Sequence, residues 1–157
     1  MIPRAAARVR AGLLLGAAAM LLSPAAIAGD IAVSSAWARA TPPGAMMGAA
    51  YFVIDNRGTS PDRLVAASSP RAESVEIHAV VREGELVRMR RAEPLAVAAG
   101  TRVALAPGGL HAMLVNLVAP LRAGERLPLT LRFERSGVLQ VDAQVVAAGA
   151  TPPAAAR

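Results

Sequence analysis

The stretch of sequence that decides the fold class is Arg126-Leu127-Pro128-Leu129-Thr130-Leu131-Arg132-Phe133-Glu134. Apolar and polar side chains alternate along it: Leu127, Leu129, Leu131 and Phe133 are apolar, and Arg126, Thr130, Arg132 and Glu134 are polar. Because successive side chains on a β-strand point to opposite faces, this alternation predicts a strand over 127–133 with one buried face.

Short apolar runs of this kind recur from residue 31 to residue 146. Besides 127–133, strands are expected near 31–38, 48–55, 63–67, 74–82, 85–91, 102–105, 110–117 and 138–146. Turn residues separate them, for example Pro42-Pro43-Gly44 and Pro107-Gly108-Gly109. Regular turn spacing without a sustained helical period predicts one all-β sandwich or barrel domain over 29–147 with few helices. The Ala- and Pro-rich tail, 148–157, shows no pattern and is expected to be disordered.

The first 28 residues are expected to be a secretory signal peptide rather than part of the fold. Basic residues at 4, 8 and 10 precede an apolar run over 11–22, and Ala26-Ile27-Ala28 has the small-x-small pattern of a cleavage site. The alternative is a membrane anchor, but a run of about 12 residues is shorter than the roughly 20 that span a bilayer. We therefore expect cleavage after Ala28, a periplasmic location and no membrane span in the mature protein.

Composition excludes several classes of function. The sequence has no cysteine, so it can neither form a disulfide nor hold a thiolate-ligated blue-copper centre. Loss of the signal peptide lowers the net charge from +6 to +3, because that segment carries three arginines and no acid. The basic residues form no run and aromatic residues are only 3% of the chain, so nothing indicates nucleic-acid binding. No Ser-His-Asp arrangement, carboxylate pair or Gly-rich phosphate loop stands out, so an enzyme is not expected.

The residues that carry chemistry are two histidines, each with a methionine placed beside it by local geometry. A two-residue turn at Glu83-Gly84 would pair His78 directly with Met89 in an antiparallel hairpin, with Cβ atoms about 4.5–5.5 Å apart. His111 and Met113 are two residues apart on a predicted strand and therefore project to the same side. Each imidazole is thus expected to have a thioether neighbour.

This pairing of ligand types favours copper over other metals. Thioether sulfur is soft and uncharged and selects Cu(I), whereas imidazole binds copper in either oxidation state. Zinc sites use thiolate, imidazole or carboxylate, and calcium and magnesium sites need clusters of oxygen ligands. A lone histidine on a strand is typically structural and a lone methionine typically fills a core, so these residues leave a metal-free structural β-sandwich open as the alternative. Met46 and Met47 are interpreted as core or surface filling rather than as ligands.

The same four residues carry a resemblance to a known family. The spacing His78-x10-Met89-x21-His111-x-Met113 is similar to the metal motif of the periplasmic copper(I) chaperone family PCuAC, formerly a domain of unknown function. Four further stretches resemble that family: 36–44, 50–58, 62–65 and 107–114. The resemblance covers roughly 31–146, which is the whole predicted domain.

This resemblance implies a cupredoxin-like Greek-key β-sandwich that binds one Cu(I) ion at an exposed His2Met2 site formed by His78, Met89, His111 and Met113. It also implies delivery of copper toward the dinuclear copper centre of cytochrome c oxidase, with subunit II or a Sco-type thiol protein as the acceptor. We expect a monomer. Some family members end in a His- and Met-rich tail that holds Cu(II), but the tail here has no such ligand, so a second site is not expected.

Two other functions remain open at this point. One is a copper enzyme or electron-transfer protein, which would need an open coordination position at the metal. The other is a periplasmic copper-buffering or resistance protein that has no dedicated acceptor.

Overall fold

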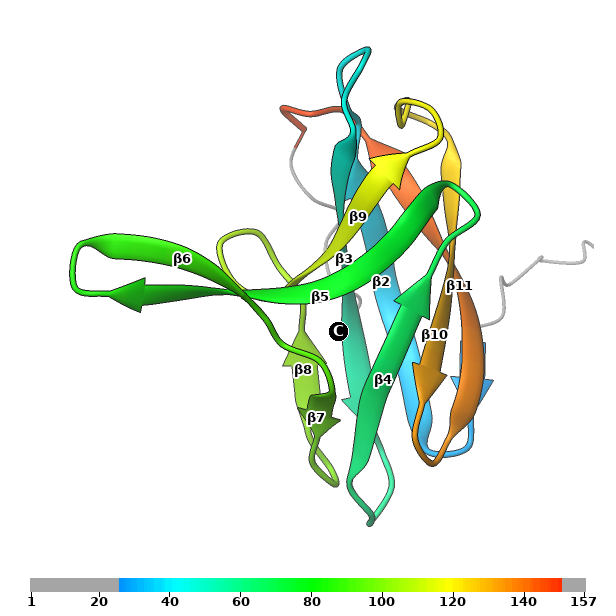
Figure 1. Ribbon diagram of the computed structural model, residues 1–157. Coiled ribbons are helices and arrows are strands. Elements are labelled where there is room, and N and C mark those ends of the chain that lie inside the picture. The colour runs from blue at the N-terminus through cyan, green and yellow to red at the C-terminus, as the bar shows by residue number, and fades with distance from the viewer. Residues whose placement is uncertain (1–25, 151–157) are drawn as a thin grey trace, which may run out of the picture.

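In the computed structural model, which describes residues 26–150, every regular element is a β-strand (Figure 1). The strands are β1 (Ala26–Ala28), β2 (Ile31–Arg39), β3 (Met47–Asn56), β4 (Asp62–Ser68), β5 (Ala72–Glu83), β6 (Leu86–Arg91), β7 (Leu95–Val97), β8 (Arg102–Ala104), β9 (His111–Leu117), β10 (Arg126–Phe133) and β11 (Gly137–Val146). Within these residues no helix has the length and apolar character needed to cross a membrane.

The expectation of an all-β domain is confirmed, and each predicted strand lies within two residues of an observed one at both ends. The stretch that decided the fold class forms β10, and its four apolar side chains are at most 2% exposed. Two strands were not predicted. β7 has only three residues after a proline, too few to show alternation, and β1 is formed by the last three residues of the predicted signal peptide.

The strands join in one closed circuit with the order β2-β11-β10-β4-β5-β9-β3, in which β3 returns to pair with β2. Strands that are distant in sequence lie side by side, as β10 does with β4 and β5 with β9. These crossovers are of the Greek-key kind, and β2 and β11 run parallel where they meet. The predicted Greek-key β-sandwich is therefore confirmed.

The space inside the circuit is filled almost entirely by aliphatic side chains. Leu127, Leu129 and Leu131 of β10 meet residues from the other strands, and Phe52 and Phe133 are the two aromatic members of this core. The fully buried members include Ile31, Ile54, Leu64, Ile77, Val97, Leu114 and Leu121. The chain has no cysteine and therefore no disulfide, and burial of this apolar core holds the strands together.

The distal half of β5 leaves the barrel and pairs with β6 as a two-stranded ribbon that projects from one side (Figure 1). The predicted register of this hairpin was wrong. Glu83 pairs with Leu86, so the turn residues are Gly84-Glu85, and Met89 lies opposite Val80 rather than opposite His78. The reason is the turn type: Gly84 has φ +64°, and a two-residue hairpin with glycine in its first central position places that glycine directly after the strand.

This two-residue shift keeps Met89 on the same face of the ribbon as His78. Only a one-residue slip would have turned the side chain to the opposite face. The two residues are therefore diagonal neighbours instead of direct partners.

Two predictions concern the ends of the chain. The predicted signal peptide, 1–28, lies outside the described residues apart from the three that form β1. The predicted tail is described only over 148–150, where the Ala150 N–H donates to the Ala147 carbonyl in a turn.

Candidate metal centre

The two histidines of the predicted mature chain meet on adjacent strands. β5 and β9 pair antiparallel, and their register sets His78 directly opposite His111. The centres of the two imidazole rings are 6.0 Å apart and the ring planes are inclined by 68°. Residues 33 positions apart in sequence are thus brought together by the sheet.

Both rings lie on the outer face of the sheet, away from the hydrophobic core. On β5, Val75 and Ile77 are buried in the core and alternate with Glu76 and His78. On β9, Ala112 and Leu114 are buried in the core and alternate with His111 and Met113. Since neighbours along a strand point to opposite faces, Glu76, His78, His111 and Met113 form one group on the outer face.

The hydrogen bonds of His78 leave one ring nitrogen free. The Nε2–H donates to Oε2 of Glu76 over 2.9 Å, and a carboxylate can only accept, so the proton of the neutral ring is on Nε2. The other nitrogen, Nδ1, is buried and has no hydrogen-bond partner. Among the described residues, every other buried side-chain nitrogen or oxygen has one. Burying such an atom unpaired is costly, so its lone pair is a place where a cation would be stabilised.

His111 is held in the complementary way. Its Nδ1–H donates to the backbone carbonyl of Gly109 over 3.1 Å, which leaves the lone pair on Nε2. Gly109 belongs to the turn before β9, and its carbonyl also accepts from the N–H of Val80 at 3.4 Å. The His111 side chain is buried, with 6% of the residue exposed. Metal-binding histidines commonly make such a hydrogen bond with the ring nitrogen that does not bind the metal, and this bond fixes the tautomer.

The two methionines of the predicted set differ in their surroundings. Met113 is partly buried and lies opposite Glu76 of β5 and Ala49 of β3, next to the histidine pair. Met89 lies on the projecting ribbon, opposite Val80, and is 59% exposed. The structure therefore brings His78, His111 and Met113 together on one sheet face, and it places Met89 diagonally from His78 on the ribbon.

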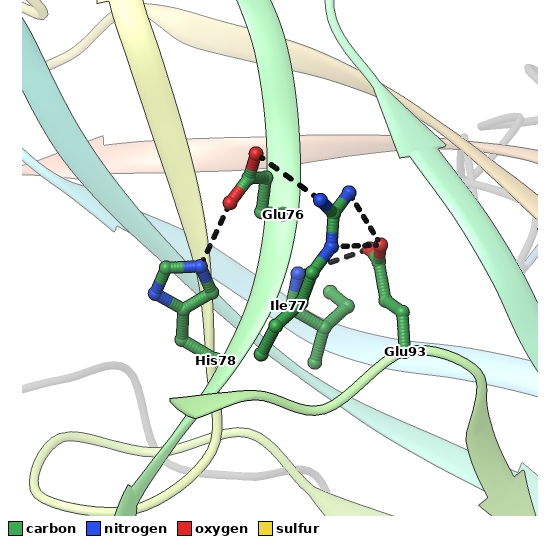
Figure 2. A network of polar contacts seen from close by, with 5 residues as sticks. Glu76, Ile77, His78 and Glu93 are labelled. Atoms are coloured by element: carbon green, nitrogen blue, oxygen red, sulfur yellow. Dashed lines mark hydrogen bonds and ion pairs between the residues drawn. The ribbon is translucent and has the colours of Figure 1, made fainter. Parts of the chain in front are cut away.

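Glu76 is a site residue that sequence analysis missed. Figure 2 shows its carboxylate between His78 and a guanidinium group, which belongs to Arg91 at 3.6 Å. Arg91 also pairs with Glu93, whose other oxygen accepts the N–H of Ile77 at 3.0 Å (Figure 2). The His78 N–H, and with it the charge of Arg91, holds the pKa of Glu76 below its ordinary value. The available signal was its position two residues before His78 on the same strand.

The other two methionines of the predicted mature chain lie at or just before the start of β3. Met47 is opposite Val115 and so shares the outer face with Met113, and it is 47% exposed. Met46 precedes the strand, is 56% exposed, and its backbone carbonyl accepts from Leu117. A hollow of about 510 Å³ lies elsewhere, beside β4 and β7, and none of the four predicted ligands lines it.

Comparison with known proteins gives a family match from the sequence and several solved structures with the same fold. Residues 31–145 match the family described as "Putative lipoprotein LpqE-like". A "Putative lipoprotein Lxx21020" from Leifsonia xyli subsp. xyli is 38% identical over 112 residues, which are 71% of this chain. The chain covers 66% of that relative's length, just under two thirds.

Solved structures with the same fold carry PCuAC domains. The copper-bound PCuAC domain from PmoF2 is 30% identical with a TM-score of 0.68, and the match covers 77% of this chain and 96% of that one. The apo form of the PmoF2 domain has a TM-score of 0.70 at 28% identity, covering 82% and 98% of the two chains. The CuI-DR1885 structure from Deinococcus radiodurans is 32% identical with a TM-score of 0.59, covering 73% and 76%.

These matches confirm the resemblance inferred from the His/Met spacing and the cupredoxin-like fold class. The family match spans nearly the whole barrel, from the first residue of β2 almost to the end of β11. The chain belongs to the LpqE-like family and has the fold of the PCuAC domains.

Proposed function

We propose that this protein is an extracytoplasmic copper chaperone that carries one Cu(I) ion on His78, Met89, His111 and Met113. Support comes from the family match and from the copper-bound PCuAC structures that share the fold. Two imidazoles and two thioethers form a neutral, soft donor set, which suits a monovalent soft ion.

The observation that carries the proposal is the unpaired, buried Nδ1 of His78 beside the His111 ring. Glu76 and the Gly109 carbonyl hold the two rings so that each keeps one nitrogen lone pair for a metal ion. The fit extends to Met113, whose thioether occupies the next outward position after His111 on β9. Met89, exposed on the ribbon, is the ligand that an acceptor can most easily displace.

Copper is cargo in this proposal, and no catalytic step is involved. Thioethers bind Cu(I) more weakly than thiolates do, so the ion passes downhill to an acceptor with cysteine ligands. The acceptor we propose is a Sco-type thiol protein or subunit II of cytochrome c oxidase, and the destination is the dinuclear copper centre of that enzyme. Transfer would take place in the periplasm after removal of residues 1–28. The intact mass of the secreted protein tests this processing, because it should correspond to a chain that begins at Gly29.

The test is a Cu(I) competition titration on four single variants, His78→Ala, Met89→Leu, His111→Ala and Met113→Leu. Each should weaken Cu(I) binding, and Zn(II) should bind the wild type more weakly than Cu(I) does. Met46→Leu is the matched control for Met89→Leu, because Met46 is 56% exposed and Met89 is 59% exposed. Unchanged Cu(I) affinity in all four ligand variants would exclude this site.

Transfer to a thiol acceptor separates chaperoning from copper buffering. If the protein is a chaperone, Cu(I) leaves it when a reduced Sco-type domain is added, and the transfer can be followed over time. Retention of the ion in the presence of that acceptor would favour the buffering function instead.

A further inference from the structure

The β5–β6 ribbon is unusual in what it exposes. It projects from the barrel (Figure 1), and all six residues of β6 are exposed. Leu86, Val87 and Met89 are large apolar side chains that are 58%, 57% and 59% exposed. Exposed apolar residues gathered on one short projecting strand are typical of an interaction surface rather than of scattered surface residues.

The register sorts these side chains onto two faces. Val80 pairs with Met89 and Arg82 pairs with Val87, so these four residues lie on the face that carries His78. Leu86 pairs with Glu83 and lies on the opposite face. We call the group Val80, Arg82, Val87 and Met89 the ligand-side face of the ribbon. It runs without interruption from the proposed copper ligands to the tip of the hairpin.

The two faces also differ in how their charges are satisfied. On the opposite face, Arg88 and Arg90 both pair with Glu83, and the Arg88–Glu83 distance is 3.7 Å. On the ligand-side face, the guanidinium group of Arg82 makes no hydrogen bond or ion pair with any of the described residues. This face therefore combines exposed aliphatic groups with one uncompensated positive charge, and a complementary surface is apolar with a carboxylate.

We propose that the ligand-side face of the ribbon is the docking surface for the protein that accepts copper. This inference rests on the proposed function. The partner presents an apolar patch and an acidic side chain next to its thiol ligands, so that docking on Val87 and Arg82 brings those thiols to Met89. Contact begins at the ribbon, and the first ligand exchanged is the one that stands on it.

A second copy of this chain fits the ribbon poorly. Among the described residues β6 pairs only with β5, so its other edge is free. Antiparallel pairing of this edge with its own copy over most of the strand would set Arg88 opposite Arg88 or Arg90 of the copy. Like charges directly opposite each other destabilise a strand pair. An acidic partner that covers the ligand-side face avoids this conflict.

The experiment compares variants on the two faces of the same strand. Val87→Ser and Arg82→Glu alter the ligand-side face and spare every proposed ligand. Leu86→Ser is the matched control, because Leu86 adjoins Val87 and is equally exposed, and Val138→Ser on β11, at 56% exposed, is a control away from the ribbon. The probe is the reduced soluble domain of a Sco-type thiol protein, and the Kd of its complex with the copper-free chain is measured by calorimetry.

Val87→Ser and Arg82→Glu should each raise this Kd about tenfold, as loss of a central interface residue does, and both controls should leave it unchanged. The effect of Arg82→Glu should shrink in high salt, because screening weakens an exposed charge pair. Cu(I) transfer to the same domain should slow in parallel, whereas transfer to dithiothreitol, which is too small to reach along the ribbon, should proceed at the wild-type rate.

The proposed docking surface would be overturned by any of three results: equal effects of test and control variants, no effect of either test variant, or no complex with the wild type. A concentration-dependent dimer that Val87→Ser abolishes would overturn it too, since it would make a second copy the occupant. Failure of the proposed function is seen separately as a lack of Cu(I) binding by the wild type, because the Kd measurement contains no copper.

Discussion

Adjacent residues on β9 should separate copper binding from folding. Leu114 is fully buried in the core, while Met113 beside it is partly buried on the outer face with the histidine pair. We predict that Leu114→Ala lowers the stability of the copper-free protein by about 3–4 kcal/mol. Removing three carbon atoms costs about 2.4 kcal/mol in transfer free energy, and the cavity that they leave adds the remainder.

Met113→Ala should have the opposite profile. It removes a partly buried side chain from a face outside the core, so the free energy of unfolding should fall by only about 1 kcal/mol. Its Cu(I) affinity should fall by at least about 10- to 100-fold. That is the usual loss when a residue that only supports a metal ligand is removed, and Met113 is a proposed ligand itself. Leu114→Ala should retain its Cu(I) affinity as long as it is folded.

The assays are urea unfolding of the copper-free proteins and Cu(I) competition titration of the folded ones. With an unchanged slope of about 1–3 kcal/mol per molar urea, Leu114→Ala should lower the midpoint by about 1–4 M. The core should hold the fold without the ion, unlike structural metal sites, where binding energy is folding energy. An unfolded copper-free wild type, or a Met113→Ala variant that loses as much stability as Leu114→Ala, would refute this prediction.

Three further predictions concern other parts of the molecule. Glu76→Gln should lower Cu(I) affinity about 10- to 100-fold by weakening its hydrogen bond to the His78 ring, and Glu85→Gln at the ribbon turn, as the control, should leave a competition titration unchanged. Gly58→Ala should cost about 1–3 kcal/mol in a urea melt, because its new Cβ would lie 2.6 Å from Cβ of Asp30, and most of that cost should vanish in an Asp30→Gly background. Burial raises the pKa of Asp62, but hydrogen bonds from Ser136 and from the N–H groups of Arg135 and Arg63 outweigh it and keep that pKa below its ordinary value. Its stabilising contribution is therefore complete above about pH 4 and is lost as the pH falls further, so melts between pH 5 and about pH 2 should decline less steeply for Asp62→Asn than for wild type.

The fold could be predicted from the sequence wherever one strand carried its own signal. Leu127, Leu129 and Leu131 alternate with more exposed residues because one face of β10 is buried and the other is not. Consecutive residues of one strand therefore show the difference between the two faces. β7 carried no such signal, because three residues cannot display a period. Its pairing with β4 places Val97 in the core.

The candidate site was predicted as a set of residues but not as an arrangement. The hairpin pattern predicts a turn at Glu83-Gly84, one residue too early, and so pairs His78 with Met89. The pairing of His78 with His111 depends on β5 and β9 lying side by side, and no local pattern in either strand specifies that neighbour.

Glu76 shows why the chemistry of the site depends on this long-range pairing. On an isolated strand, a carboxylate two residues from an imidazole is an ordinary solvated neighbour. In the barrel, β9 lies beside β5, and the side chain of His78 is only 17% exposed. The hydrogen bond to Glu76 then sets which ring nitrogen of His78 carries the proton. The lone pair left on Nδ1 meets no hydrogen-bond donor, and the Gly109 carbonyl fixes the tautomer of the facing His111 ring. The pair of rings that favours a metal ion is therefore a property of two paired strands and a turn, and it arises only once the barrel has closed.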